Sequence, residues 1–310
     1  MPVHMKTRRS MAVRGQSGFS LMEMMVSVFI VLVIAGTTMT AIFQMTKTES
    51  TIWNRTEMHS GVRSATELLQ QEVGQAGRIA LPSAVTLTAA VAAGTQTVTV
   101  SSATGMFTGE QLTIDTGAIQ ETVALTNVVS SSNQITGIFT NAHASGAAVR
   151  VQGGFASGIV PTSTTNGSTG SILKLYGDIN DDGSMVYVEY KCDTAGGNLY
   201  RNVMAFSAAS KPAVTTSQIL LNNIQPNPGG TACFTYQQKT VGADTYVLDV
   251  AITLTVQTQE KDLQTNTYQK ETKALLNVSP RNVFDVWELA SGGVTNRVQP
   301  MPASVTNLLP

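Results

Sequence analysis

An uncharged apolar run near the N-terminus constrains this chain more than any other feature. Between Glu23 and Lys47 there is no Asp, Glu, Lys or Arg side chain. A helix rises 1.5 Å per residue and needs about 20 apolar residues to cross the hydrocarbon core of a bilayer. The run is long enough for that crossing. The sequence therefore predicts a membrane-spanning helix over residues 19–46, with the lipid bilayer as its partner.

The segment before this run, residues 1–18, is basic. It contains no acid and four cations, Lys6, Arg8, Arg9 and Arg14. A basic segment followed by an apolar one is also typical of a secretory signal peptide, which has a short apolar core and a small-residue cleavage site. Here the core is too long and a helical pattern continues beyond it, which favours a retained anchor. The cations predict a single-pass protein with a cytoplasmic N-terminus and with everything after Lys47 on the other side of the membrane.

Glu23 is unusual at the start of such a helix, because a lone carboxylate there costs about 2.5–3.5 kcal/mol on insertion scales. A cut between Gly18 and Phe19 would create an α-amine four residues before it. In a low-dielectric medium, the amine of one copy and the carboxylate of its neighbour attract strongly. We therefore expect Glu23 to pair with the amine of Phe19 on a neighbouring copy.

The stretch GFSLME at residues 18–23 resembles the class III signal of type IV pilins and pseudopilins. The resemblance implies cleavage after Gly18 by a prepilin peptidase, N-methylation of Phe19 and use of Glu23 in subunit docking. It also implies a place in the inner membrane with a periplasmic globular domain before assembly. Assembly would then take place with other minor and major pilins on an inner-membrane platform, and the final place would be a filament at the cell surface. The alternative is an ordinary single-span anchor with Glu23 at the headgroup level.

The helical pattern continues beyond the apolar run. Positions spaced by three and four residues form one face of a helix: Ile52, Thr56, His59, Val62, Ala65, Leu69, Val73, Ala76 and Ala80. This pattern predicts an amphipathic segment over residues 47–84, ended by Pro82. His59 is expected to pack on this face and not to bind a metal, because no second His or Cys lies at metal-ligand spacing.

Three stretches of this segment, SGVR at 60–63, ELLQQEV at 67–73 and AGR at 76–78, are similar to the PilW group of minor pilins. The resemblance implies a minor pilin in a tip complex that initiates a type IV pilus, and so a role in twitching motility and cell adhesion. The J-class pseudopilin of type II secretion shares the leucine-acid run but usually lacks the Ala-Gly ending. It is one alternative, and a membrane-anchored adhesin that never polymerises is another.

Short alternating segments recur about every ten residues between positions 85 and 152, separated by Gly, Ser and Asn. This spacing predicts an inserted small β-sandwich or barrel. Its GMFTG (105–109) and HASG (143–146) stretches resemble a β-module of assorted bacterial surface and phage proteins, which implies no activity. The insert is either a spacer or an adhesive face. Residues 153–170 have the composition of a linker.

Residues 171–298 contain further alternating runs, the clearest of which spans 245–258 and predicts one buried and one solvated face. They predict a curved antiparallel pilin sheet packed on the helix, with a hairpin across 259–267. The Pro-rich tail 299–310 is expected to be flexible. The predicted fold class is α+β: a long N-terminal helix, half transmembrane and half amphipathic, packed on an antiparallel sheet, with an inserted β-module.

The segment from Asp178 to Gly183, with Glu189 beyond it, matches the EF-hand calcium pattern. The residues after the loop are strand-like, and a strand carries Glu189 about 16 Å from Ser184, too far to close the site. Two interpretations remain. Asp178, Asn180 and Asp182 hold Ca²⁺ with help from water or another loop, or they form a hairpin turn without an ion. No other cofactor is expected.

The remaining composition narrows the function classes. The two cysteines, Cys192 and Cys233, lie in the exported part, where a disulfide forms readily. Such a bridge is worth roughly 4 kcal/mol in the chain-entropy model, and two separate buried thiols are the alternative.

There are 19 Lys and Arg against 20 Asp and Glu, and no basic stripe with aromatics, so nucleic-acid binding is not indicated. We expect no enzyme, because no catalytic motif occurs.

Overall fold

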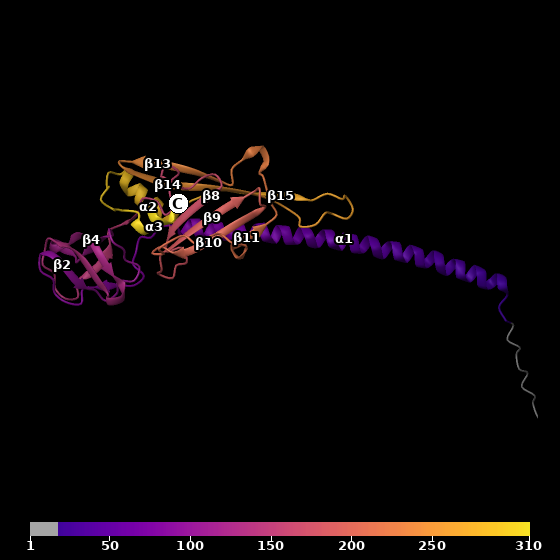
Figure 1. The fold of residues 1–310 in the computed structure, drawn as a ribbon, viewed down its shortest axis with the longest axis horizontal. Helices are drawn as coiled ribbons and strands as arrows, with labels where there is room; N and C mark the ends of the chain where they lie inside the picture. Colours follow the sequence, from indigo (N-terminus) through magenta and orange to yellow (C-terminus); the bar gives the residue numbers. More distant parts are fainter. Residues whose placement is uncertain (1–17) are drawn as a thin grey trace, which may run out of the picture. The chain divides into compact units, whose positions relative to one another are not determined.

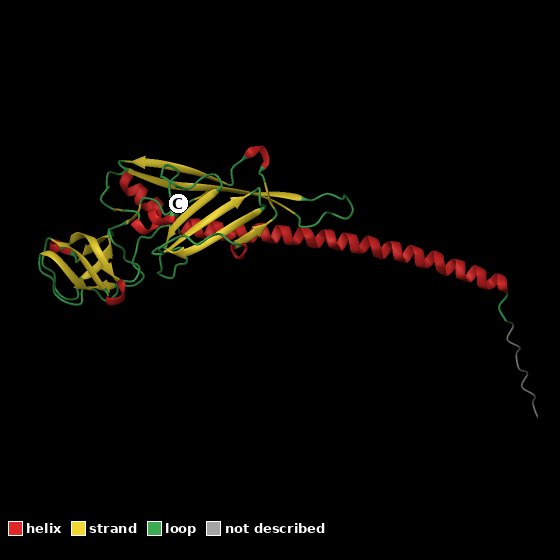
Figure 2. Cartoon of the chain, in the orientation of Figure 1, coloured by secondary structure: helices red, strands yellow, loops and turns green. Residues whose placement is uncertain are grey.

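The structure is a computed structural model that describes residues 18–310. The predicted leader, except for Gly18, lies outside these residues. The predicted fold class is confirmed: a long N-terminal helix is combined with antiparallel sheets (Figures 1 and 2). The chain divides into two compact units. One contains the chain up to Trp53 together with Asp262–Asn266, and the other contains Asn54–Lys261 and Thr267–Pro310.

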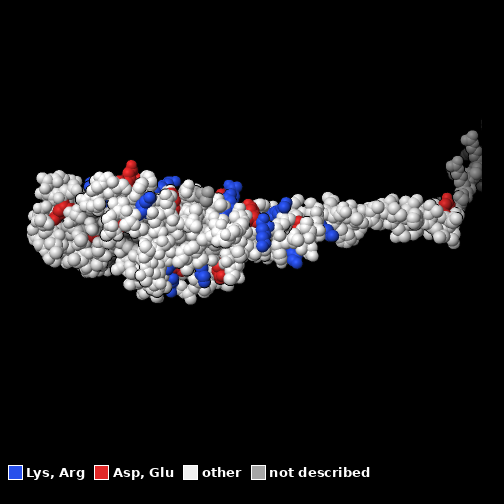
Figure 3. Space-filling model, turned by 90° about the horizontal axis from the view of Figure 1, so that it is seen from above, with Lys and Arg blue, Asp and Glu red and all other residues white. Residues whose placement is uncertain are grey.

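Helix α1 (Leu21–Gln75) includes the predicted span from Leu21 onward, and it is the one described helix that is long and apolar enough to cross a membrane. Its N-terminal part is exposed and almost free of charge (Figure 3). Threonine hydroxyls along this part donate to carbonyls three or four residues earlier: those of Thr37, Thr38, Thr40 and Thr46. Polar groups satisfied within the helix are compatible with a hydrocarbon environment.

The C-terminal half of α1 buries the predicted stripe from Val62 onward, but the earlier positions of that stripe are exposed. Met58, Val62, Ala65, Leu69 and Val73 are buried. His59 is not a packing residue, because more than half of its side chain is exposed and its Nδ1 contacts Glu271. The prediction for His59 was wrong because Met58, and not His59, packs on the buried face before Val62.

Helix α1 also ends earlier than the predicted 84. Gly77 has φ of +88°, and its N–H donates to the carbonyl of Tyr176 at 2.9 Å. A Cβ on Gly158 would lie 2.0 Å from the Gly77 nitrogen. The two backbones therefore meet so closely that the chain leaves the helix before Pro82 is reached.

The region after α1 forms a six-stranded antiparallel sheet in the order β1-β6-β3-β4-β5-β2. Its strands are β1 (Val85–Thr86), β2 (Gly94–Thr99), β3 (Gln111–Ile114), β4 (Glu121–Val129), β5 (Gln134–Phe139) and β6 (Ala148–Val151). A bridge between Leu87 and Val100 joins the two edges, so the sheet closes into a small barrel with its own apolar core. The predicted β-module is therefore present, as a barrel.

Two four-stranded antiparallel sheets follow (Figure 1). One has the order β11-β10-β9-β8, from β8 (Ile172–Gly177), β9 (Val186–Asp193), β10 (Asn198–Ala205) and β11 (Ile219–Asn222). In the other, β14 (Asp244–Gln257) pairs with β12 (Ile224–Gln225), β13 (Phe234–Val241) and β15 (Lys270–Val278). Both contribute to one core with the buried stripe of α1, as expected for a sheet packed on that helix.

Helix α2 (Arg281–Ser291) was not predicted. Its Val283, Val286 and Ala290 pack on Tyr246 and Leu248 of β14. Leu248 is therefore buried, as the alternation predicted, but it packs against α2 and not in the core that contains Val250. The spacing of the three small apolar residues, at i, i+3 and i+7, is the helical signal that identifies α2.

Two further expectations are corrected. Residues 153–170 are not a free linker, because β7 (Gly154–Phe155) pairs in parallel with β16 (Val298–Gln299), and Phe155, Ile159 and Val160 are buried. The tail 299–310 is not loose, because α3 (Ala303–Leu308) buries Val305 and Leu308 in a core with Phe155. The Gly, Ser and Pro residues of these two segments form turns between buried apolar side chains.

Candidate functional site

The predicted processing site lies at the start of α1. Gly18, Phe19 and Ser20 precede the helix, and all three are exposed, with Phe19 82% accessible. The Gly18–Phe19 bond is therefore outside regular secondary structure and accessible to a protease. Leu21 begins the helix, which places Glu23 in its first turn.

Ser20 and Glu23 form reciprocal hydrogen bonds. The backbone N–H of Glu23 donates to Ser20 Oγ, and the backbone N–H of Ser20 donates to Glu23 Oε2, both at 3.2 Å. The Ser20 carbonyl accepts the N–H of Met24 at 3.1 Å, as the first bond of the helix. This arrangement is a capping box, in which two amides left unpaired at a helix start are satisfied by side chains.

The capping box changes the interpretation of Glu23. Its carboxylate has a partner within its own chain, and it lies at the positive end of the helix dipole, which favours an anion. We had inferred from the sequence that it needs a partner from outside. The signal that was missed is the spacing S-x-x-E before an apolar run, which by itself predicts a capping box.

The same geometry leaves acceptor capacity for a second partner. The capping bond uses Oε2, and an ionised carboxylate can accept hydrogen bonds at both oxygens. An amine on a neighbouring copy can therefore reach Oε1 without breaking the cap. The structure describes a single chain, so the predicted pairing of Glu23 with a neighbour's Phe19 amine stays a prediction.

At the other end of α1 a buried polar network joins the helix to the sheet. Glu72 accepts hydrogen bonds from Arg201 Nε at 3.0 Å and from the Tyr190 hydroxyl at 2.5 Å. Burial, and the charge of Glu72 beside it, raise the pKa of Tyr190 far above its usual value, so the phenol stays a donor. The sequence pattern had placed Glu72 off the packing face, but it is buried.

Arg78 connects the end of this helical region to the barrel. Its guanidinium is buried, forms an ion pair with Glu110, and donates to the Gly105 carbonyl at 2.5 Å. It also lies over the ring of Phe107. Burial raises the pKa of Glu110 to about 7, although the Arg78 charge opposes the rise. The Arg of the AGR stretch therefore anchors the barrel to the chain that follows α1.

In the calcium-like loop, the carboxylate oxygens of Asp178 accept the backbone N–H groups of Asp182 and Gly183 at 3.1 and 3.0 Å. Asp182 accepts the N–H of Ser184 at 2.8 Å. Glu189 lies within β9 and binds Lys211, so it does not close the loop, as expected. No group of three or more His, Cys, Asp or Glu side chains placed to hold a metal occurs in residues 18–310. The contacts are those of an Asx turn, and both interpretations of the loop, with and without calcium, stay predictions.

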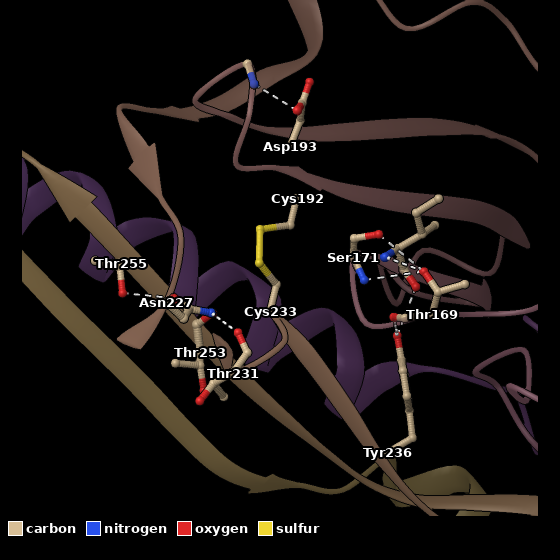
Figure 4. The surroundings of a disulfide bond; sticks show 12 residues. Thr169, Ser171, Cys192, Asp193, Asn227, Thr231, Cys233, Tyr236, Thr253 and Thr255 are labelled. Carbon is tan, nitrogen blue, oxygen red and sulfur yellow. Dashed lines mark hydrogen bonds between the residues drawn. A yellow bond between two sulfur atoms is a disulfide. The ribbon is translucent and has the colours of Figure 1, made fainter. Parts of the chain in front are cut away.

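Cys192 and Cys233 are joined by a disulfide (Figure 4). Cys192 lies in β9 and Cys233 directly precedes β13, so the bond connects the two four-stranded sheets. Beside it, the Asn227 side chain donates to the carbonyls of Thr231 and Thr253. The bond lies in the part of the chain predicted to be exported, where disulfides form and persist.

Comparison with known families gives one match. Residues 13–39 match the family model described as the prokaryotic N-terminal methylation motif. This range includes the predicted cut site, Glu23 and the first part of the apolar run. No curated protein matches the chain. The chain thus carries the N-terminal signal of type IV pilin-like proteins, which in general are processed by a prepilin peptidase and assemble with other pilins, and its apolar helix fits a membrane anchor.

Proposed function

We propose that this chain is a minor pilin of the PilW group, which takes part in a tip complex that initiates a type IV pilus. The observation that carries the proposal is the position of Glu23. It lies in the first turn of an exposed helix, five residues into the chain that a cut after Gly18 would leave, and the apolar run follows it. The methylation-motif match over residues 13–39 supports a type IV pilin-like protein in general, and the SGVR, ELLQQEV and AGR stretches are the reason for proposing the PilW group.

The proposed mechanism uses two properties of α1. In the membrane, with the N-terminus cytoplasmic and the globular domain periplasmic, the apolar faces of neighbouring helices pack together. The Phe19 amine of one copy then pairs with Glu23 of the next and sets the register between them, because a charge pair in a low-dielectric medium is strong and specific in position. After assembly the protein resides in the filament at the cell surface, where it would serve twitching motility and adhesion.

The capping box supplies a sharp test of this mechanism. Glu23→Gln keeps a side chain that can accept the Ser20 amide but removes the negative charge. Ser20→Ala removes the cap, worth about 1 kcal/mol, but keeps the carboxylate. We expect Glu23→Gln to abolish incorporation into filaments while the protein is still made and processed, and Ser20→Ala to assemble nearly normally. The measurement is the amount of the protein in sheared filaments relative to the cell pellet.

The outcomes separate the alternatives. Loss of incorporation in Ser20→Ala but not in Glu23→Gln would assign Glu23 a capping role only and contradict the docking mechanism. Normal piliation with lost attachment in both variants would favour the membrane-anchored adhesin. A J-class pseudopilin would have the same apolar anchor and the same pairing of the Phe19 amine with Glu23. It would be found with a type II secretion machine and be absent from sheared pili.

A further inference from the structure

The turn between β14 and β15 returns to the helix at the end of the apolar run. Gln264 Nε2 donates to Thr48 Oγ1 at 3.2 Å. Residues Asp262–Asn266 belong to the same compact unit as the chain up to Trp53. Thr48 is two residues beyond Thr46, the last residue of the predicted span, which is about 3 Å along the helix axis. The turn is therefore held level with the end of the apolar run.

The length of the run places this level at the membrane surface. Residues 21–46 extend about 39 Å as a helix. A bilayer has a hydrocarbon core of about 30 Å and a total thickness of about 40–45 Å with its headgroups. A helix that begins at one headgroup layer thus ends its apolar run in the other. Because Gln264 is bound at Thr48, the turn lies in or against that second headgroup layer.

The turn is built to present Leu263 outward. The Asp262 carboxylate accepts the N–H groups of Gln264 and Thr265 at 2.7 and 3.2 Å, and the Asp262 carbonyl accepts the N–H of Asn266 at 2.7 Å. These bonds fix the backbone on both sides of Leu263, whose side chain is 55% exposed. An apolar side chain on a fixed turn loses little conformational freedom when it is buried elsewhere.

The residues that flank the turn have the chemistry of a membrane interface. Lys261 Nζ lies 5.7 Å from the centroid of the Tyr268 ring, and Tyr268 is partly exposed. Trp53, which follows Thr48 by five residues in α1, is also exposed. Tyr and Trp are enriched at the headgroup level, and Lys places its charge there while its stem covers apolar surface.

We propose that the turn Asp262–Asn266 rests on the lipid surface and inserts Leu263 at the boundary between headgroups and acyl chains. It would be a second membrane contact beside the anchor, on the face of the bilayer opposite Glu23. The inference depends on the proposed function only in that α1 crosses a bilayer, and it does not require that the protein assembles into a filament.

The test uses the full chain in vesicles of phosphatidylcholine and phosphatidylglycerol, with single tryptophan reporters in a Trp53→Phe, Trp287→Phe background. The reporters are Leu263→Trp in the turn, Phe29→Trp in the span as the insertion control, and Ile138→Trp on the exposed surface of β5 as the aqueous control. Emission is recorded with and without lipids brominated on the acyl chains near the carbonyl.

We expect the reporter at 263 to emit at shorter wavelength than the reporter at 138 and to lose emission with brominated lipids, whereas the reporter at 138 does not. Quenching at 29 without quenching at 263 would overturn the membrane contact and leave the anchor intact. A short-wavelength emission at 263 that brominated lipids do not quench would place the residue against protein, and would also overturn it. Absence of quenching at 29 would contradict the membrane anchor and, with it, this inference.

Discussion

The hydroxyl of Tyr190 donates to Glu72 Oε2 at 2.5 Å across the interface between α1 and β9. Arg201 of β10 binds the same carboxylate through Nε and through a second nitrogen. Glu72 is 3% exposed, so its charge is stabilised by these two partners and not by water. The network therefore fixes one position of the amphipathic half of α1 on the sheet.

Arg201→Ala is expected to lower the free energy of unfolding by about 3 kcal/mol. This is the low end of the range for breaking a buried ion pair, because Arg201 is itself partly exposed. The matched control is Arg63→Ala, which removes an ion pair with Glu67 on the exposed face of the same helix, and it should leave stability unchanged. Urea denaturation of the full chain in detergent measures both. Equal effects of the two variants would contradict a structural role for the network.

The buried carboxyl of Glu110 makes stability depend on pH. Burial raises its pKa to about 7, above the ordinary value near 4.5, so between these values the folded state binds a proton that the unfolded state does not. The contribution of Glu110 to the free energy of unfolding is therefore fully present below about pH 4.5, and it is lost as the pH rises to about 7. The loss is up to about 3 kcal/mol, at about 1.36 kcal/mol per pH unit.

The measurement is the melting temperature against pH for the wild type and for Glu110→Gln. Asp115 and Glu121 have lowered pKa values. Hydrogen bonds from the Thr116 amide and from His143 lower the pKa of Asp115. Burial by itself would raise the pKa of Glu121, but hydrogen bonds from His143 and from backbone amides lower it by more. Their contributions are lost as the pH falls, and they are common to both proteins. The melting temperature of the wild type minus that of Glu110→Gln should therefore fall as the pH rises from about 4.5 to about 7. A difference that is constant or rises would show that Glu110 is ionised throughout.

The Asp178 turn gives a prediction on calcium. Its carboxylate oxygens already accept two backbone N–H groups, so we expect the turn to form without an ion. Melting temperatures in calcium and in chelator should then agree for the wild type. A calcium-dependent rise that Asp182→Ala removes, seen also as heat in a calorimetric titration, would instead establish a Ca²⁺ site at Asp178, Asn180 and Asp182.

The bond between Cys192 and Cys233 should be measurable in stability. Replacing both cysteines with alanine is expected to cost about 2–5 kcal/mol, since the bond restricts the unfolded chain and ties two sheets together. The same loss should follow reduction of the wild type, and the double variant should not respond to reductant. Two free thiols in the mass spectrum of the unreduced protein would contradict the bond.

Much of the fold could be predicted from the sequence because its patterns are local. The apolar run marks α1, and the alternation around Leu248 marks β14. Features set by tertiary contact could not be predicted in this way. Helix α1 ends at Gln75 because Gly77 meets the backbone near Gly158, and Leu308 is buried only because the tail packs on Phe155.

The candidate site shows the same division. The spacing from Gly18 to Glu23 predicts processing and docking, and the capping box was also encoded there, by Ser20. The role of Arg78 could not be predicted, because its partner Glu110 lies 32 residues away, directly before β3. A long-range ion pair leaves no periodic signal in a sequence.

The proposed assembly depends on one event: a prepilin peptidase cuts this chain after Gly18, and the new amine is used at the N-terminus of the helix. The most direct test is the mass spectrum of the N-terminal peptide of protein purified from the membrane of cells that contain the peptidase. We expect a peptide that begins with N-methylated Phe19, as this cleavage requires. An N-terminus at any other residue, or an intact leader, would contradict it.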